Sequence, residues 1–463
     1  MRAFLSALRQ RAVDVKPDEL RAMWLAFVFN FVILAGYYIL RPIREEIGAS
    51  SGVENLPWMY TFTLIGMLIA NALFAAIVTR MSRRKFLPIA YRFAIANLFI
   101  FFLLMRVVSP QWQWLLARSF FVWVSVFNLF VVSVFWQFMT DVFTNEQGKR
   151  LFGFISIGGA LGGIFGPTIT ASLIQTIGAA NLILICAAML EIAAQVVRFF
   201  PGDFEMEDGR QRLSGATGVA PVAPDQQAVG PSAKTGEAPV FQKRASEKAI
   251  GGSMWAGITH ILRSPYLFVL FLFIIFYTVT STWAYFQQSD LARFQIRDSG
   301  LRTAFLARLD LSVNTLELLG LIFLAGRLMK WLGVGITLVL MPALSMVGFI
   351  TIGFLPLLSV LAAFQVLRRA TTFAITRPAR EVLFTVLPRE DKYKAKSVID
   401  TFAYRVGDQI GAWSYRGMHA AGLGLSPISF IAVPVIAVWC GLCLWLGRKQ
   451  SALARAQPKE AAA

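Results

Sequence analysis

Two stretches of the sequence repeat one pattern, DVFTNEQGKR at residues 141–150 and EVLFTVLPRE at residues 381–390. Each stretch begins with an acidic residue at the end of a long apolar segment, continues as a charged turn and leads into another long apolar segment. This match in position and character predicts that the chain consists of two structurally related halves.

The segments around this repeat have the composition of membrane-spanning helices. Of the 463 residues, 57% are hydrophobic and only 15% are charged, whereas globular domains average about 25% charged residues. A soluble fold cannot bury so much apolar surface, so the sequence predicts a lipid bilayer as its solvent. A span needs about 20 apolar residues, and we predict spans at 22–43, 57–79, 86–108, 111–140, 151–176 and 179–200, and at 264–288, 305–329, 333–354, 355–376, 396–424 and 426–447.

A polar stretch separates the two sets of six spans. Residues 201–263 form the predicted linker, in which Ser214–Pro239 has no apolar periodicity and is typical of a disordered segment. Residues 254–262 carry apolar side chains at helical spacing, which predicts a short helix on the membrane surface. The remaining regions are a basic N-terminus (1–21), an N-terminal six-helix bundle (22–200), a C-terminal six-helix bundle (264–447) and a basic tail (448–463).

The basic charge of the chain predicts its orientation in the membrane. There are 44 Lys and Arg residues against 26 Asp and Glu residues, a net charge of +18. When the loops are sorted alternately, the side with the N-terminus receives roughly thirty basic residues and the opposite side fewer than about ten. Both termini and the linker are therefore predicted to be cytoplasmic, and binding of nucleic acid is not needed to explain the charge.

Several chemistries are poorly supported by the residue inventory. The chain has only two histidines, His260 and His419, and three cysteines, which argues against a histidine metal site, a Ser-His-Asp triad and a disulfide framework. No G-x-x-x-x-G-K-[ST] phosphate loop occurs, so ATP hydrolysis by the chain itself is not expected. The basic N-terminus lacks the features of a cleaved signal peptide. We predict no enzyme activity, no metal and no cofactor.

Six spans, a cytoplasmic linker and six further spans are the layout of the major facilitator architecture. The predicted fold class is an all-α polytopic membrane protein with 12 transmembrane helices in two six-helix bundles and both termini cytoplasmic. The fifth span carries Gly153, Gly162, Gly166 and Pro167, which resembles the glycine motif of major facilitator antiporters, although Thr170 and Ala171 replace its usual closing glycines. Close packing of neighbouring helices is the simpler explanation of this spacing.

The end of the first span carries two arginines that suit recognition of an anion. Arg41 and Arg44 are three residues apart, so on a helix they project from nearly the same face, and Pro42 between them perturbs the backbone. Two guanidinium groups can hold phosphate or carboxylate with paired hydrogen bonds. The alternative is that they are anchors at the membrane interface, with Arg41 paired to Glu45.

Other ionisable residues are predicted at membrane depth, where each costs at least ~2–3 kcal/mol unless it is paired or hydrated. Local ion pairing is the simplest explanation for Asp400, Arg405 and Asp408. Arg368 and Arg369 have no acidic neighbour within a helical turn, and Arg377 has none apart from Glu381. We predict that these arginines face an anion. The further members of this set are Arg118, Glu191 and Glu317.

Three motifs together resemble the ATP/ADP translocase (nucleotide transporter) family, a branch related to the major facilitator superfamily. They are YILRPIRE at residues 38–45, FWQFMTD at 135–141 with Lys149 and Arg150, and KSVID at 396–400 with RVG at 405–407. The resemblance implies exchange of nucleotides, mostly ATP for ADP, without hydrolysis. It also implies roles for Arg44 and Asp141, because nucleotide-transporting members carry a required lysine and an acidic residue there.

Two positions depart from the nucleotide-transporting pattern. That pattern has a glutamate near Thr280 and a lysine near Asp408, and both charges are lost in this sequence. A relative that moves another organic anion would show the same departures. The substrate, the coupling ion and the choice among uniport, symport and antiport are therefore left open by the sequence.

The function we expect is secondary exchange of an anionic solute, plausibly ATP and ADP, through a site at the middle of the membrane. The protein is expected to be a monomer surrounded by lipid in the inner membrane of a bacterium. The alternatives are proton-coupled symport through Asp141, Glu317 or Asp408, and a membrane sensor or scaffold that transports nothing. The predicted substrate-binding residues are Arg41, Arg44, Arg118, Asp141, Arg368, Arg369 and Arg377, and those predicted for gating or coupling are Arg83, Lys149, Arg150, Glu317, Asp400, Arg405 and Asp408.

Overall fold

The computed structural model describes residues 15–17, 19–78, 83–200, 259, 261–323, 325–387, 396 and 398–456. Across these residues the elements are helices, and none of them is a strand. The predicted linker and most of the predicted surface helix at 254–262 lie outside this set.

The first half of the chain forms α2 to α6. Its helices are α2 (Leu20–Ser51), α3 (Leu56–Val78), α4 (Arg83–Val107), the short η1 (Pro110–Trp112), α5 (Gln113–Val142) and α6 (Asn145–Arg198). α6 contains two spans, because the backbone breaks at Gly178, where φ is 76°. A side chain would strain the backbone at that φ, so glycine suits the tight connection between the two spans.

The second half forms α9 to α16. Its helices are α9 (Pro265–Gln295), α10 (Ser299–Phe323), α11 (Ala325–Phe354), α12 (Leu358–Thr371), α13 (Arg377–Leu383), α15 (Tyr404–Ala420) and α16 (Leu425–Ala456). A π-helical turn, η2 (Thr372–Thr376), joins α12 to α13, and a second, η3 (Ile399–Ala403), leads into α15. α11 breaks at Gly333, whose φ of 71° repeats the connection seen in α6.

Within the described residues, the first half contributes six membrane-crossing helices once α6 is divided at Gly178. The second half also contributes six, namely α9, α10, the part of α11 after Gly333, the segment joined by η2, the segment of η3 and α15, and α16, because residues 325–332 of α11 are too few to cross a membrane. In the described part of the chain, nine stretches are long and apolar enough to cross a membrane by composition alone, and one of them, Arg150–Arg198, contains two spans. α10 and α15 are the less apolar members because they carry charged residues such as Asp310 and Arg405. The predicted fold class, two six-helix bundles, is confirmed.

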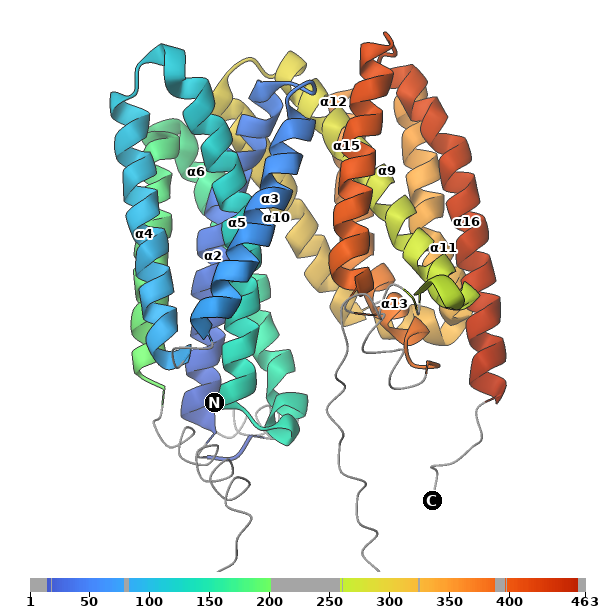
Figure 1. The fold of residues 1–463 in the computed structure, drawn as a ribbon, viewed down its shortest axis with the longest axis horizontal. Coiled ribbons are helices and arrows are strands. Elements are labelled where there is room, and N and C mark those ends of the chain that lie inside the picture. Colours follow the sequence, from blue (N-terminus) through green and yellow to red (C-terminus); the bar gives the residue numbers. More distant parts are fainter. Residues whose placement is uncertain are drawn as a thin grey trace, which may run out of the picture.

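The two halves stand side by side and meet at one face of the molecule (Figure 1). The contacts that join them include a Thr61–Gln409 hydrogen bond of 2.9 Å and a Trp58–Trp413 ring contact of 5.0 Å. α2 begins and α16 ends at the opposite face, toward which the halves diverge in Figure 1. Because the charge bias assigns the chain ends to the cytoplasm, this is an inward-facing arrangement.

A row of glycines on α6 lets it lie against the backbone of α2. A methyl group at Gly162 would overlap the carbonyl oxygen of Phe31, and one at Gly166 would come within 2.5 Å of the Ala35 oxygen. Thr170, one turn further on, donates from its hydroxyl to the Ile39 carbonyl at 3.2 Å, so the contact continues where the glycine motif ends. Gly153 differs from the prediction, because no atom lies within 4 Å of the place where its methyl group would be.

We predict that Gly162→Ala destabilises the protein by about 1–3 kcal/mol, because the added methyl group must displace the backbone of α2. Gly153→Ala is the matched control on the same helix, and it should be neutral or slightly stabilising because alanine favours helix over glycine by up to about 1 kcal/mol. Unfolding midpoints of the purified variants in detergent measure both effects. Equal midpoints for the two variants would contradict the packing role of Gly162.

Candidate functional site

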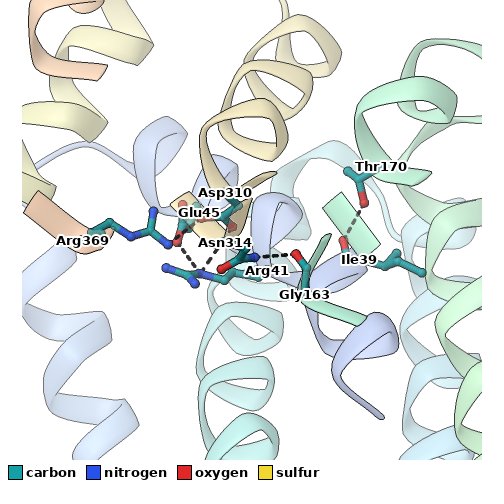
Figure 2. Close-up of polar contacts among 8 residues, drawn as sticks. All are labelled: Ile39, Arg41, Glu45, Gly163, Thr170, Asp310, Asn314 and Arg369. Atoms are coloured by element: carbon teal, nitrogen blue, oxygen red, sulfur yellow. Dashed lines mark hydrogen bonds and ion pairs between the residues drawn. The ribbon is translucent and has the colours of Figure 1, made fainter. Parts of the chain in front are cut away.

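A buried carboxylate lies between arginines at the centre of the molecule. Asp310 of α10 has no exposed surface, and its Oδ1 accepts from Nη2 of Arg369 at 2.6 Å. Its Oδ2 lies 3.5 Å from Nε of Arg41, which also donates to Oε1 of Glu45 at 2.9 Å. Figure 2 shows these four side chains converging from α2, α10 and α12. Since α2 belongs to the first half and α10 and α12 to the second, the cluster joins the two bundles.

This four-residue cluster is balanced in charge, and its members depend on one another. Arg41 and Arg369 are 18% and 13% exposed, and Glu45 is 4% exposed. Removing one partner from such a buried group leaves an uncompensated charge, which costs about 3–5 kcal/mol. A second pair extends the junction toward the closed face, where Arg302 of α10 donates to Glu46 of α2 at 2.6 Å.

A further polar link holds the same helices together. The side-chain amide of Asn314 on α10 donates to the carbonyl oxygen of Gly163 on α6 (Figure 2). A methyl group at Gly163 would lie 3.2 Å from that amide nitrogen, so the small residue leaves room for the contact. The glycine row on α6 therefore packs against α2 with one face and meets the second bundle with another.

Arg44 lies near this junction without a carboxylate partner in the described part of the chain. Its guanidinium carbon is 4.4 Å from the centre of the Phe121 ring, and its buried Nε has no hydrogen-bond acceptor. Gly48, one turn further along α2, lies against the Tyr285 hydroxyl of the second bundle. Arg44 thus lies on the α2 face that meets Phe121 and Tyr285, at the interface between the bundles.

Two arginines of the second bundle also lack carboxylate partners among the residues that the structure describes. Arg368 is 5% exposed and donates to the Ser281 hydroxyl at 2.7 Å and to Oε1 of Gln365 at 3.3 Å. Arg377 is exposed, and its guanidinium carbon lies 4.2 Å from the centre of the Phe373 ring. These two residues are separated by about 14 Å along their helix. Glu317 of α10 is half-buried and has no ion-pair partner in the same set.

Two predicted substrate-binding residues do not fit a site at the middle of the membrane. Arg118 follows the start of α5 by one and a half turns and lies over the Trp114 ring at 4.9 Å. Asp141 is the last residue but one of the same helix. The two are therefore about 35 Å apart along the axis of α5, and both lie far from the helix centre. We leave both out of the candidate site.

The predicted gating residues are divided among separate local contacts. Arg405 pairs with Asp408 at 3.2 Å, three residues along the same helix, whereas Asp400 pairs with Arg380 at 3.1 Å. Thr280, where a glutamate was expected from the family resemblance, is fully buried and donates to the Phe276 carbonyl of its own helix at 2.8 Å. The side chains of Arg83 and Lys149 lie outside the described residues.

Arg150 takes part in a contact at the predicted cytoplasmic face. Its Nη2 donates to Oε1 of Glu19, just before α2, at 2.9 Å. Burial alone would raise the pKa of the Glu19 carboxyl, but the backbone N–H of Lys16 and the side chains of Arg150 and Gln147 outweigh it and lower that pKa below its usual value. Glu19 is therefore ionised at neutral pH and ties the start of α2 to the start of α6.

The sequence analysis missed three residues of the buried junction between the two bundles: Asp310, Glu46 and Arg302. Asp310 was the one with a detectable signal, because it is an acidic residue inside the predicted apolar span 305–329, like Glu317, which the sequence analysis did single out. Arg369 appeared to lack a partner because its partner is 59 residues away. Glu46 and Arg302 are 256 residues apart and come together only through the docking of the two bundles.

The comparison with protein families gives a match that covers most of the chain. Residues 23–412 match the model of the Major Facilitator Superfamily. The chain belongs to this superfamily of membrane transporters. The two-bundle fold agrees with that membership.

Solved structures of other superfamily members share the fold at low sequence identity. A bacterial homologue of the iron transporter ferroportin in an inward-facing state aligns over 94% of this chain and all of that chain, with a TM-score of 0.60 and 10% identity. A D-xylose-proton symporter aligns over 93% and 97% of the two chains, with a TM-score of 0.58 and 11% identity. The nucleoside transporter NupG aligns over 96% and 100%, with a TM-score of 0.54 and 12% identity.

Curated relatives match over a shorter length. ADP,ATP carrier protein 1 of Chlamydia muridarum is 24% identical over 215 residues, 42% of this chain and 40% of that protein. The methylenomycin A resistance protein of Bacillus subtilis is 28% identical over 195 residues, 39% of each chain. The matched stretch thus spans about two fifths of these relatives.

We predict that Asp310→Asn lowers the free energy of unfolding by about 3–5 kcal/mol, because it leaves Arg41 and Arg369 without their shared counter-charge. Adding Arg369→Gln should restore part of the loss, since one uncompensated charge is removed. Glu191→Gln is the control, because the Arg92–Glu191 pair at 3.0 Å is 44% and 40% exposed and such pairs contribute about 1 kcal/mol or less. Unfolding in detergent of the wild type, Asp310→Asn, Arg369→Gln, the double variant and Glu191→Gln checks this, and strictly additive losses of the two single changes in the double variant would refute the coupling.

Proposed function

We propose that this transporter moves an organic anion by alternating access, with a binding site between the bundles formed by Arg44, Arg368 and Arg377. The observation that carries the proposal is that these arginines lack carboxylate partners in the described part, while their neighbours Arg41, Arg369 and Arg302 are neutralised. The interface therefore carries an excess of positive charge that a bound anion would balance.

The cost of such charges is the physical argument for a ligand. An unpaired arginine at membrane depth destabilises the protein by at least ~2–3 kcal/mol. Such residues are therefore rare, and where they occur they usually mark a functional site. Arginine offers planar paired donors that match phosphate and carboxylate groups. Phe121, Tyr285 and Tyr60 surround the region of Arg44 with aromatic surface; the Tyr60 and Tyr285 rings are 6.2 Å apart. This combination suits an anion that carries an aromatic or apolar part.

A nucleotide is the substrate that we propose to test first. The superfamily members similar to this chain include an ADP,ATP carrier and a nucleoside transporter, and a nucleotide combines phosphate charge with an aromatic base. Asp408 carries the opposite charge to the residue expected in nucleotide transporters, and it is paired with Arg405. Other organic phosphates and carboxylates therefore belong in the same screen.

The same charges suggest how the anion could couple to the motion of the bundles. An outward-facing state requires separation of Arg41 from Asp310 and of Arg302 from Glu46, since each pair joins the two bundles. A substrate anion that contacts Arg41 or Arg369 would take the place of the Asp310 carboxylate. Binding would thereby offset the cost of separating the buried pairs, which is the energetic requirement for a substrate-dependent transition.

The test is uptake into proteoliposomes that contain the purified protein and are loaded with an unlabelled member of the panel. Counterflow of a labelled nucleotide, organic phosphate or carboxylate that requires an internal anion supports exchange. Uptake that needs only a pH gradient supports a second candidate, proton-coupled symport, for which the unpaired Glu317 is the proposed proton carrier. Absence of flux for every anion would overturn the proposal.

We predict that Arg44→Ala lowers the transport efficiency kcat/KM by about 10- to 100-fold, the loss expected for a charged hydrogen bond, without lowering the unfolding midpoint. Arg44→Lys should keep part of the activity because the charge remains while the paired donors are lost. Arg118→Gln is the matched control, because this arginine lies over Trp114 near the start of α5, away from the proposed binding site, and its replacement should not affect flux. Full activity of Arg44→Ala would make Arg44 a structural anchor.

A further inference from the structure

A second cationic site lies outside the path between the bundles, on the side of the molecule predicted to face the outer leaflet. It is a cavity of about 690 Å³, within the usual range for ligand pockets, lined by the first span of α6 at Ala171 and Gln175, by the α9–α10 turn and by α10. Arg297 and Arg308 contribute the positive charges. The lining does not include Arg41, Arg44, Arg368 or Arg377, so this cavity is separate from the candidate transport site.

The position of Arg308 is unusual for a charged residue. It is exposed on α10, about 14 Å along the helix from Ser299, and no ion-pair partner exists for it in the described part. Its exposed neighbours on α10 are mixed, with Leu301 54% exposed and Leu316 37% exposed beside the exposed Ser312 and Thr315. An arginine on the surface of a membrane-spanning helix extends toward the membrane surface, where an anionic headgroup can pair with it.

The acidic residue at the cavity does not satisfy these arginines. Asp298 accepts from the backbone N–H of Leu301 at 2.6 Å. That hydrogen bond and one with the Gln175 side chain lower the pKa of Asp298 below its usual value, so its negative charge is held by the start of α10 and by Gln175. Arg297 and Arg308 remain available to an external anion.

We propose that this cavity binds the headgroup of an anionic phospholipid, with its phosphate between Arg297 and Arg308 and its acyl chains along Phe294 and Leu301. Exposed apolar side chains border the cavity, Phe294 at 70% and Leu301 at 54% exposed, which suits a lipid rather than a freely soluble anion. The cavity is lined by both bundles. A lipid bound there favours the state in which α6 and α10 are close together at this cavity. Separating the two bundles would break the contacts between the lipid and one of these helices.

The test compares the purified, full-length protein in detergent with added phosphatidylglycerol, phosphatidylcholine or water-soluble glycerophosphoglycerol. Phosphatidylglycerol should raise the unfolding midpoint of the wild type more than phosphatidylcholine does. Arg308→Gln and Arg297→Gln should each lose at least half of this difference. Arg106→Gln is the control, because Arg106 is exposed on the same predicted side of the membrane but is bonded to Asn181 at 3.0 Å, and it should keep the whole difference.

Three results would overturn the proposal. The first is an equal response to the two lipids, which would mean that the headgroup charge is not recognised. The second is a loss that is the same in Arg106→Gln as in Arg308→Gln, which would indicate general surface electrostatics. The third is an equal response to glycerophosphoglycerol at the same concentration, which would identify a soluble anion as the ligand. Native mass spectrometry of retained lipid provides a second readout that does not depend on transport or on Arg44.

Discussion

The junction between the two bundles depends on one buried carboxylate. Asp310 neutralises Arg369 within its own bundle and faces Arg41 of the other, while Glu45 supplies the second negative charge. Charges at this depth are costly unless they are paired, so the positions of α2, α10 and α12 relative to one another are constrained by the need to keep these groups together. The close packing of α6 on α2 and the Asn314–Gly163 hydrogen bond place α10 where this is possible.

The arginines at the interface fall into two groups, those that form ion pairs and those that do not. Arg41, Arg369 and Arg302 form ion pairs, whereas no ion pair is formed by Arg44, Arg368 or Arg377 in the described part of the chain. The chain belongs to the Major Facilitator Superfamily, and under the proposed function an anionic cargo would supply a counter-charge during the cycle. A cargo that replaces the Asp310 carboxylate would lower the cost of separating the bundles, so its binding would favour the change of state.

The sequence was sufficient for the fold because the fold follows from local properties. The length of each apolar segment and the repeated turns at 141–150 and 381–390 required no knowledge of distant contacts. Local spacing also anticipated the Arg41–Glu45 and Arg405–Asp408 pairs, which are four and three residues apart. The pairs that join α10 to α2 and α12 were not predictable in this way, since their partners are far apart in the sequence. The exclusion of Arg118 and Asp141 likewise needed the length and position of α5.

The most direct test of this account is binding to pairs of compounds that differ only in charge, such as AMP and adenosine, glycerol 3-phosphate and glycerol, and succinate and its diamide. Thermal stabilisation of the purified protein by each compound measures the binding. The account predicts that at least one anionic member stabilises the protein and that its uncharged counterpart does not. Equal stabilisation by the two members of every active pair, or stabilisation by none of the anions, would contradict it.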